Sequence, residues 1–276
     1  MEIEKIIDKD NIDIQIKKSG IYHYTYDFEK INSKNVNIKI DDNIDVKLFE
    51  KYQSKQNNEV FFNINIDVGA NTNVEYNVFN DDLLLKNNKK ININLNSNSA
   101  LKTYILEIAN NTNSNYVINL NEEGSRADIN LMVYADDKIT QNHDIKINNL
   151  KPYTISTMNN NGVINNMASC NFNLTSFIKK GSLKSSANQS NRILTLSDNC
   201  IAKINPQLLI DEYDVTGSHG TTCGQISDEI LYYMESRGID KILAYRLVAI
   251  GSLLKNVSED LYELLIKKLE RRINYE

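Results

Sequence analysis

Hydrophobic and polar residues alternate with a period of two along most of the chain between residues 61 and 178. The run from Phe62 to Val68 is typical, because every second residue is apolar and the residues between are polar or charged. This alternation indicates β-strands that bury one face. Small residues such as Gly69 and Ala70 separate successive runs. We therefore expect strands in pairs, joined by short turns.

The alternating segments recur at a regular interval. Five apolar residues each lie 27 positions apart: Ile93, Leu120, Ile147, Leu174 and Ile201. A period near 27 with two strands per repeat fits a coil whose turns stack in parallel and present the same phase of inward apolar residues to one another. A sandwich of hairpins has no reason to hold a constant interval. The pattern therefore predicts a solenoid core over residues 61–226.

Asparagine is unusually frequent, with 42 copies in the chain, of which 40 precede position 207. In stacked turns, equivalent positions lie about 4.8 Å apart. Asparagine tolerates left-handed backbone at turns, and its amide can bond to the copy in the next turn. The alternative is an AT-rich genome that raises asparagine at solvent-facing positions. Either way, the segment 207–276 is nearly bare of asparagine and must belong to a different structural regime.

The pattern over residues 1–60 is less regular. Segments 12–16, 21–26 and 36–40 alternate and predict strands. They fit two arrangements equally well, either the first turns of the coil or a separate N-terminal cap.

Residues 227–276 have a helical pattern and predict a small C-terminal domain. Ser227 and Asp240 are suited to cap two helices, and Gly238 to end the first. A third helix is expected to begin after Ser258. The apolar stripe of the second helix is expected to comprise Leu243, Leu247, Ile250 and Leu254, and that of the third Leu261, Leu264, Leu265 and Leu269. Three short helices cannot form a large core alone, so they either dock on the coil or present a surface to a partner.

Composition excludes several classes of protein. The formal net charge of −5 argues against a dedicated nucleic-acid binder. The three cysteines form no CxxC pair, which argues against a zinc ribbon or a cluster site within one chain. The charged N-terminus does not resemble a signal peptide, and no apolar stretch is long enough to span a membrane. We expect a cytoplasmic protein without a membrane partner.

Three segments are recognisable as motifs: Gln189 to Leu209, Ser218-His-Gly-Thr-Thr-Cys-Gly-Gln225, and Leu231-Tyr-Tyr-Met-Glu-Ser-Arg-Gly-Ile239. In this order they resemble the C-terminal half of the SufB/SufD family of iron–sulfur cluster assembly proteins, in its SufD-like form. The resemblance is strong between about residues 140 and 240 and diffuse before that.

The resemblance implies a right-handed parallel β-helix with a small C-terminal helical domain. It also implies pairing with a SufB-like subunit or a second identical chain, docking of a SufC-like ABC-type ATPase on the helices, and transfer of clusters to apo iron–sulfur proteins. Such a chain is a non-catalytic scaffold rather than an enzyme. The sequence agrees, since no P-loop motif is present.

The same resemblance points to site residues. His219 matches the SufD-type histidine, which implies a ligand for a transient iron–sulfur cluster at a subunit interface; a buried histidine with both nitrogens satisfied is the alternative. Cys200 matches a second cysteine of the family, and its thiolate could bind iron, or it could simply be a small buried side chain. Asn191 stands where SufB-like members carry the catalytic cysteine. Cys223 is expected to be packed.

The repeat adds one hypothesis of its own. His143 and Cys170 stand 27 positions apart (170−143), so a constant interval would stack them on adjacent turns, where they could share a metal or a persulfide path.

A competing function is that of a β-solenoid that binds or cleaves carbohydrate. Such proteins usually carry a signal peptide and a cluster of Asp, Arg or Lys on one face of the coil, and neither is visible in the sequence.

Overall fold

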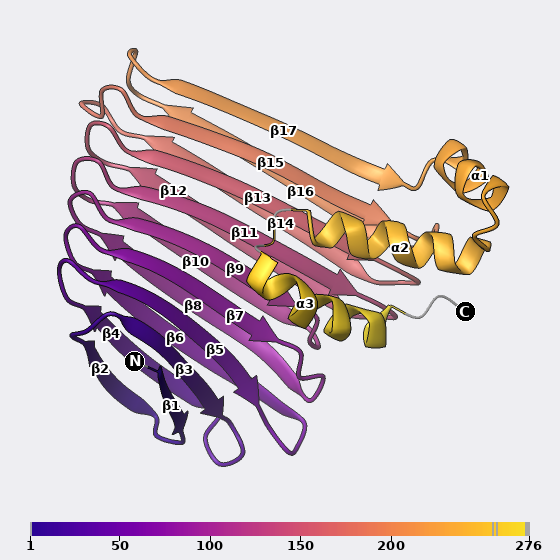
Figure 1. The fold of residues 1–276 in the computed structure, drawn as a ribbon, viewed down its shortest axis with the longest axis horizontal. Helices are drawn as coiled ribbons and strands as arrows, with labels where there is room; N and C mark the ends of the chain where they lie inside the picture. Colours follow the sequence, from indigo (N-terminus) through magenta and orange to yellow (C-terminus); the bar gives the residue numbers. More distant parts are fainter. Residues whose placement is uncertain (1, 256, 258, 274–276) are drawn as a thin grey trace.

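A computed structural model describes residues 2–255, 257 and 259–273. Strands alternate between two sheets, so each turn of the chain adds one strand to each sheet. All pairings between strands are parallel within these residues, and the chain coils through about eight turns. Figure 1 shows the strands stacked side by side from the N-terminal end to the C-terminal helices. The fold is a parallel β-helix, as the alternation and the resemblance predict.

In the described part of the chain, the first sheet has nine strands in the order β1 (Glu2–Ile7), β3 (Gly20–Asp27), β5 (Asp45–Gln53), β7 (Asn73–Asn80), β9 (Ala100–Glu107), β11 (Arg126–Ala135), β13 (Ile155–Ile164), β15 (Ser186–Thr195) and β17 (Thr216–Gln225). The second sheet, over the same part of the chain, has eight: β2 (Asn11–Ile16), β4 (Ser33–Ile40), β6 (Asn58–Val68), β8 (Leu85–Leu95), β10 (Thr112–Leu120), β12 (Thr140–Asn149), β14 (Ser169–Ile178) and β16 (Ile201–Ile210). We call these the odd and even sheets. Residues 1–60, whose role the sequence left open, contribute strands to both sheets.

The interval between turns is not constant. Ile118 pairs with Ile93 on one side and with Ile147 on the other, which are steps of 25 and 29 positions (118−93, 147−118). The prediction that residues 27 positions apart pair on adjacent turns is therefore wrong. Its last member, Ile201, lies on the outer face and is 53% exposed. Side chains alternate with a period of two, so turns whose lengths differ by an even number keep every apolar residue inside.

Asparagine ladders join the turns on the outer face of the even sheet. The Asn92 amide donates to Asn65 at 3.1 Å, Asn65 donates to Asn37 at 3.0 Å, and Asn37 donates to Asp13 at 2.8 Å. The ladder predicted from the composition is thus present. Most of its members lie along strands, however, rather than at turns, because outward strand positions also repeat at one strand spacing.

One ladder does lie at the turns. Asn43, Asn71 and Asn98 occupy the same turn position and have φ angles of 59°, 52° and 52°. Their side chains bond in sequence, Asn98 to Asn71 and Asn71 to Asn43. Gly124 continues the series with φ of 70°, and a Cβ atom there would lie 2.4 Å from Asn98 Oδ1. The left-handed backbone and the close stacking together explain Asn and Gly at this position.

Three helices follow the coil: α1 (Asp228–Ser236), α2 (Lys241–Leu253) and α3 (Glu259–Arg272). Ser227 and Asp240 cap the first two through their side chains, and Gly238, with φ of 83°, follows the end of α1. These predictions are confirmed. The cap at Ser258 and the side chain of Leu264 lie outside the described residues. Within the described residues, no helix is long and apolar enough to cross a membrane.

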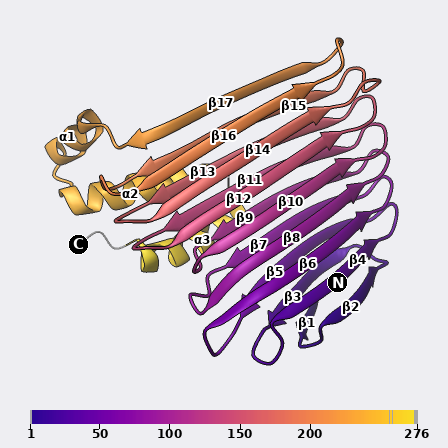
Figure 2. The same cartoon turned by 180° about the vertical axis from the view of Figure 1, so that it is seen from behind.

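The helices cover part of the odd sheet. Their apolar residues form one cluster with outward side chains of that sheet, including Leu106, Met132 and Val163. Figures 1 and 2 show α2 and α3 lying across one face of the coil and hidden behind the strands when seen from the other side. The apolar stripe predicted for α2 is wrong for two of its four residues. Ile250 and Leu254 are buried, but Leu243 and Leu247 are 40% and 46% exposed because α2 turns Ala244 and Ala249 toward the core instead.

Candidate functional site

The last turn of the coil is open. Every residue of β17 is exposed, and β16 mostly alternates between exposed and half-buried residues, whereas the inner positions of the preceding strands β14 and β15 are buried. No described strand pairs with the free edge of β16 or β17. Two unpaired strand edges and the end of the apolar core are therefore accessible at this end of the molecule.

His219 lies on this open turn, in the middle of β17. It pairs in register with Gln189, a residue of the inner face of β15. The side chain of His219 is thus placed at the mouth of the coil and is exposed. The alternative to a ligand role is a buried histidine with both nitrogens satisfied. In the isolated chain, His219 is not buried. An exposed imidazole is chemically able to ligate a metal ion.

Cys200 lies elsewhere, in the turn before β16. Its thiol is half-buried, 3.2 Å from the Ser197 hydroxyl and 3.4 Å from the carbonyl oxygen of Ile164. By contrast, the Gln189 side chain beneath His219 bonds to the Gln207 carbonyl, seven positions further along β16 (207−200). At about 3.3 Å per residue, that is roughly 20 Å of strand. The structure therefore does not bring Cys200 and His219 together.

Cys223 is exposed, so the expectation that it is packed is wrong for the isolated chain. It lies on β17 opposite Ile193 of β15, an inner position of the coil. Because the turn is open, this inner position reaches solvent. Partial desolvation raises the pKa of the Cys223 thiol. Full burial raises the pKa of Cys170, with a smaller contribution from Cys223.

The proposed stacking of His143 on Cys170 is wrong. The partner of Cys170 in β12 is Gln141, and that of His143 in β14 is Phe172. His143 instead has both nitrogens satisfied, with Nδ1 2.7 Å from the Ser114 hydroxyl and Nε2 3.2 Å from Gln141 Oε1. Burial is the main reason that its pKa falls to about 3, and the nearby Lys89 ammonium lowers it further. His143 is a neutral structural residue.

The interior also holds charged groups that are not apparent from the sequence alone. Glu50 is fully buried and accepts hydrogen bonds from the hydroxyls of Tyr26 at 3.0 Å, Tyr52 at 3.3 Å and Tyr76 at 2.7 Å. Burial raises the pKa of Glu50 to about 7, although these hydrogen bonds and the Lys89 ammonium oppose the shift. The signal that could have found it is a carboxylate at an inward position of an otherwise apolar alternation.

A second buried charge pair lies beside it. The Lys89 ammonium bonds to the Glu107 carboxylate, which also accepts a hydrogen bond from the Asn80 amide at 2.6 Å. Lys89 lies over the ring of Tyr52, 4.5 Å from its centroid. Burial lowers the pKa of Lys89, and Glu107 opposes this shift. These residues join the Glu50 cluster into one polar region inside the coil.

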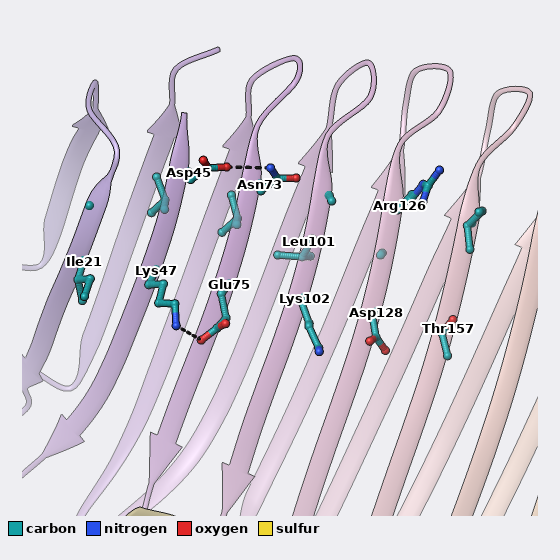
Figure 3. Close-up of a pocket in the computed structure, with 16 residues that line it drawn as sticks. Ile21, Asp45, Lys47, Asn73, Glu75, Leu101, Lys102, Arg126, Asp128 and Thr157 are labelled. Carbon is teal, nitrogen blue, oxygen red and sulfur yellow. Dashed lines mark hydrogen bonds and ion pairs between the residues drawn. The ribbon is translucent and has the colours of Figure 1, made fainter. Parts of the chain in front are cut away.

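A groove of about 620 Å³ crosses the part of the odd sheet that the helices leave open. Figure 3 shows outward side chains of alternating charge along it, one on each of four successive strands: Lys47, Glu75, Lys102 and Asp128. This cluster is not apparent from the sequence, because each member comes from a separate turn of the coil. Lys47 and Glu75 form an ion pair at 3.7 Å, and Asp128 accepts from Asn159 at 3.2 Å. The charges neutralise one another.

The described residues contain no group of three or more His, Cys, Asp or Glu side chains able to hold a metal ion. The described part of one chain therefore offers fewer than three such ligands at any one place. Of the two predicted ones, His219 is exposed at an unpaired edge, and the Cys200 thiol faces backbone carbonyls.

Two comparisons with known proteins show the family of the chain. Residues 24–252 match the SufBD core domain of the SUF system for iron–sulfur cluster assembly. The iron–sulfur cluster assembly protein SufD of Bacillus subtilis (strain 168) is 34% identical over 166 residues, which cover 59% of this chain and 38% of that protein. The chain thus matches less than half of the length of this curated relative. Since the family match spans most of the β-helix and reaches into α2, the chain belongs to the SufBD core family.

Proposed function

We propose that the chain is a non-catalytic scaffold subunit of a SUF-type iron–sulfur cluster assembly complex in the cytoplasm. The observation that carries the proposal is the open last turn, where the coil ends in two unpaired strand edges. Family membership supports the assembly role. The complex delivers clusters to apo iron–sulfur proteins, and neither nucleic acid nor a membrane takes part.

A SufB-like subunit, or a second copy of this chain, pairs with the open turn. Pairing would satisfy the free backbone groups of β16 and β17 and cover the half-buried inner residues Ala202 and Ile204, which lie at the end of the core. An exposed, uncapped end of this kind also invites aggregation, so a cognate partner stabilises the subunit as well as completing the site.

The pairing is tested by co-expression with candidate SufB-like and SufC-like proteins, followed by mass measurement of the purified complex. Ile204→Lys places a charge at the open end of the core and should abolish pairing. The matched control is Leu209→Lys on the outer face of the same strand, where the side chain is 49% exposed. Equal pairing by both variants would contradict the proposal, provided that circular dichroism shows both to be folded.

The SufC-like ATPase docks on α1 and α2. Apolar side chains gather on their free surface, with Tyr232 75% exposed, Leu243 40% and Leu247 46%. Deletion of the helices is a poor test, because it would also uncover the apolar face of the odd sheet. Leu247→Glu should instead prevent ATPase capture, while Tyr262→Glu on α3 should leave it unchanged. Retention of the ATPase by Leu247→Glu would place its docking surface elsewhere.

The nascent cluster is the cargo of the complex and is held between subunits, with His219 as the ligand from this chain. His219→Ala should lower the iron and sulfide retained after anaerobic reconstitution of the complex, measured by absorption spectroscopy. His23→Ala is the matched control, since His23 lies at the other end of the coil and pairs with Glu2. The same loss in both variants, or in neither, would refute this role. Cys200→Ser tests the second predicted ligand in the same assay.

A further inference from the structure

A cleft separates the last strands of the coil from the helices. It has a volume of about 670 Å³ and lies between β13, β15 and β17 on one side and α1 and α2 on the other. This volume is within the range of pockets that bind small organic molecules. Most of its lining belongs to the outer face of the odd sheet and to the helices, and Asn191 and Thr221, at inward positions of β15 and β17, also border it.

The coil contributes a row of donors to this cleft. Asn161, Arg192 and Thr222 are register partners on three adjacent strands, so their outward side chains stand side by side at about 4.8 Å spacing. Ser190 precedes this row by two positions on the same face of β15. A guanidinium flanked by an amide and hydroxyls is a typical environment for an anionic ligand.

The helices contribute a second cation and a buried hydroxyl. Lys255 follows the end of α2, and Ser252 lies one helical turn before it. The Ser252 Oγ atom is buried and has no hydrogen-bond partner among the described residues. A buried hydroxyl without a partner costs free energy unless a ligand or solvent atom completes it. The unpaired Ser252 hydroxyl thus points to a ligand independently of the two cations.

The charge of the cleft is positive. Its lining, as far as the structure describes it, contains Arg192 and Lys255 but no carboxylate, and neither cation forms an ion pair with a described residue. The carbonyl end of α2 contributes roughly −0.5 of a charge, which two full positive charges outweigh.

Two glycines leave room for a ligand. Gly220 on β17 and Gly251 on α2 line the cleft, and a Cβ atom added to either would meet no other atom within 4 Å. Neither glycine is needed for close packing within the chain. The apolar side chains of Ile230 and Val248 also line the cleft and can contact an organic group.

From these observations we infer that the cleft between the coil and the helices binds a small phosphorylated organic molecule, with its phosphate on Arg192 and Lys255 and its organic group against Ile230 and Val248. Such a ligand would bridge the last turn of the coil and the helical region. The inference does not depend on the cluster-assembly role.

The test uses the full chain, with phenyl phosphate as the probe and phenol and benzoate as comparisons, measured by titration calorimetry. Phenyl phosphate should bind, and phenol should not. Arg192→Gln should weaken binding about tenfold to a hundredfold through loss of charge-assisted hydrogen bonds. Gly251→Leu should abolish binding by filling the cleft, and it raises helix propensity, so the fold is retained.

The matched control is Arg237→Gln, which removes a cation that lies over the Tyr233 ring on α1 outside the cleft, and which should leave the affinity unchanged. If Arg192→Gln fails to fold, Lys255→Gln replaces it. Absence of phenyl phosphate binding at millimolar concentration would overturn the inference. So would equal binding of benzoate, or an affinity that Gly251→Leu and the charge variants leave unaltered.

Discussion

Two buried groups of the coil interior, Glu50 and His143, should make opposite contributions to the pH dependence of stability. The pKa of Glu50 is raised from 4.5 to about 7, so the native state holds a proton that the unfolded chain releases. Its stabilising effect is complete below pH 4.5 and is lost as the pH rises through 7. The pKa of His143 is lowered from 6.5 to about 3. Its effect is present above pH 6.5 and is lost as the pH falls toward 3.

The magnitudes follow from these values. Between pH 7.5 and pH 5, protonation of Glu50 adds about 2 kcal/mol to the free energy of unfolding, and the neutral His143 removes about 2 kcal/mol. In the native protein the two contributions nearly cancel. Glu50→Gln should therefore lose about 2 kcal/mol relative to the native protein on acidification, and His143→Gln should gain about 2 kcal/mol. Any effect of the amides on packing is independent of pH.

Urea denaturation at pH 5 and pH 7.5 measures these differences. The double variant Glu50→Gln/His143→Gln is the control and should regain the pH dependence of the native protein. If both single variants keep the native difference between the two pH values to within about 0.5 kcal/mol, the burial argument is refuted.

Three further changes test the packing of the coil. Lys89→Met leaves the Glu107 carboxylate buried without its cation and should cost about 3 to 5 kcal/mol in urea denaturation, whereas the double variant Lys89→Met/Glu107→Gln should cost less than the single one. Gly124→Ala should lower the thermal midpoint, because its left-handed φ of 70° and its contact with Asn98 both oppose a Cβ atom. Asn65→Ala, in the middle of a ladder, should cost about 1 kcal/mol, and a cost equal to zero would leave genome bias as the explanation of the asparagine content.

Much of the fold could be predicted from the sequence, because a strand period of two determines which face each residue takes. Segments such as 62–68 show it directly, and the caps at Ser227 and Asp240 are local signals that depend on neighbouring residues only. The register could not be predicted. It depends on turn lengths, and a step of 25 followed by a step of 29 looks like two steps of 27.

The site was less predictable. His219 stands out through its resemblance to a family motif, whereas its exposure follows from the absence of a further turn among the described residues, which is a property of the whole coil. Glu50 meets Tyr26 and Tyr76 only because β5 pairs with β3 and β7. Lys89 and Glu107 meet across the interior from β8 and β9, which lie in opposite sheets. Arg192 and Lys255 line one cleft because α2 folds back on the odd sheet.

The buried polar groups of the coil, Glu50, Lys89 and Glu107, favour one strand register over others that bury the apolar residues equally well. A strand that slips by two residues keeps its apolar side chains on the inner face, so hydrophobic burial alone tolerates the error. The same slip would part Lys89 from Glu107 and move Glu50 away from its three tyrosines, which leaves buried charges uncompensated. The buried charged groups thus raise the free energy of misaligned strand pairings. Their replacement by apolar residues should increase the population of misaligned coils.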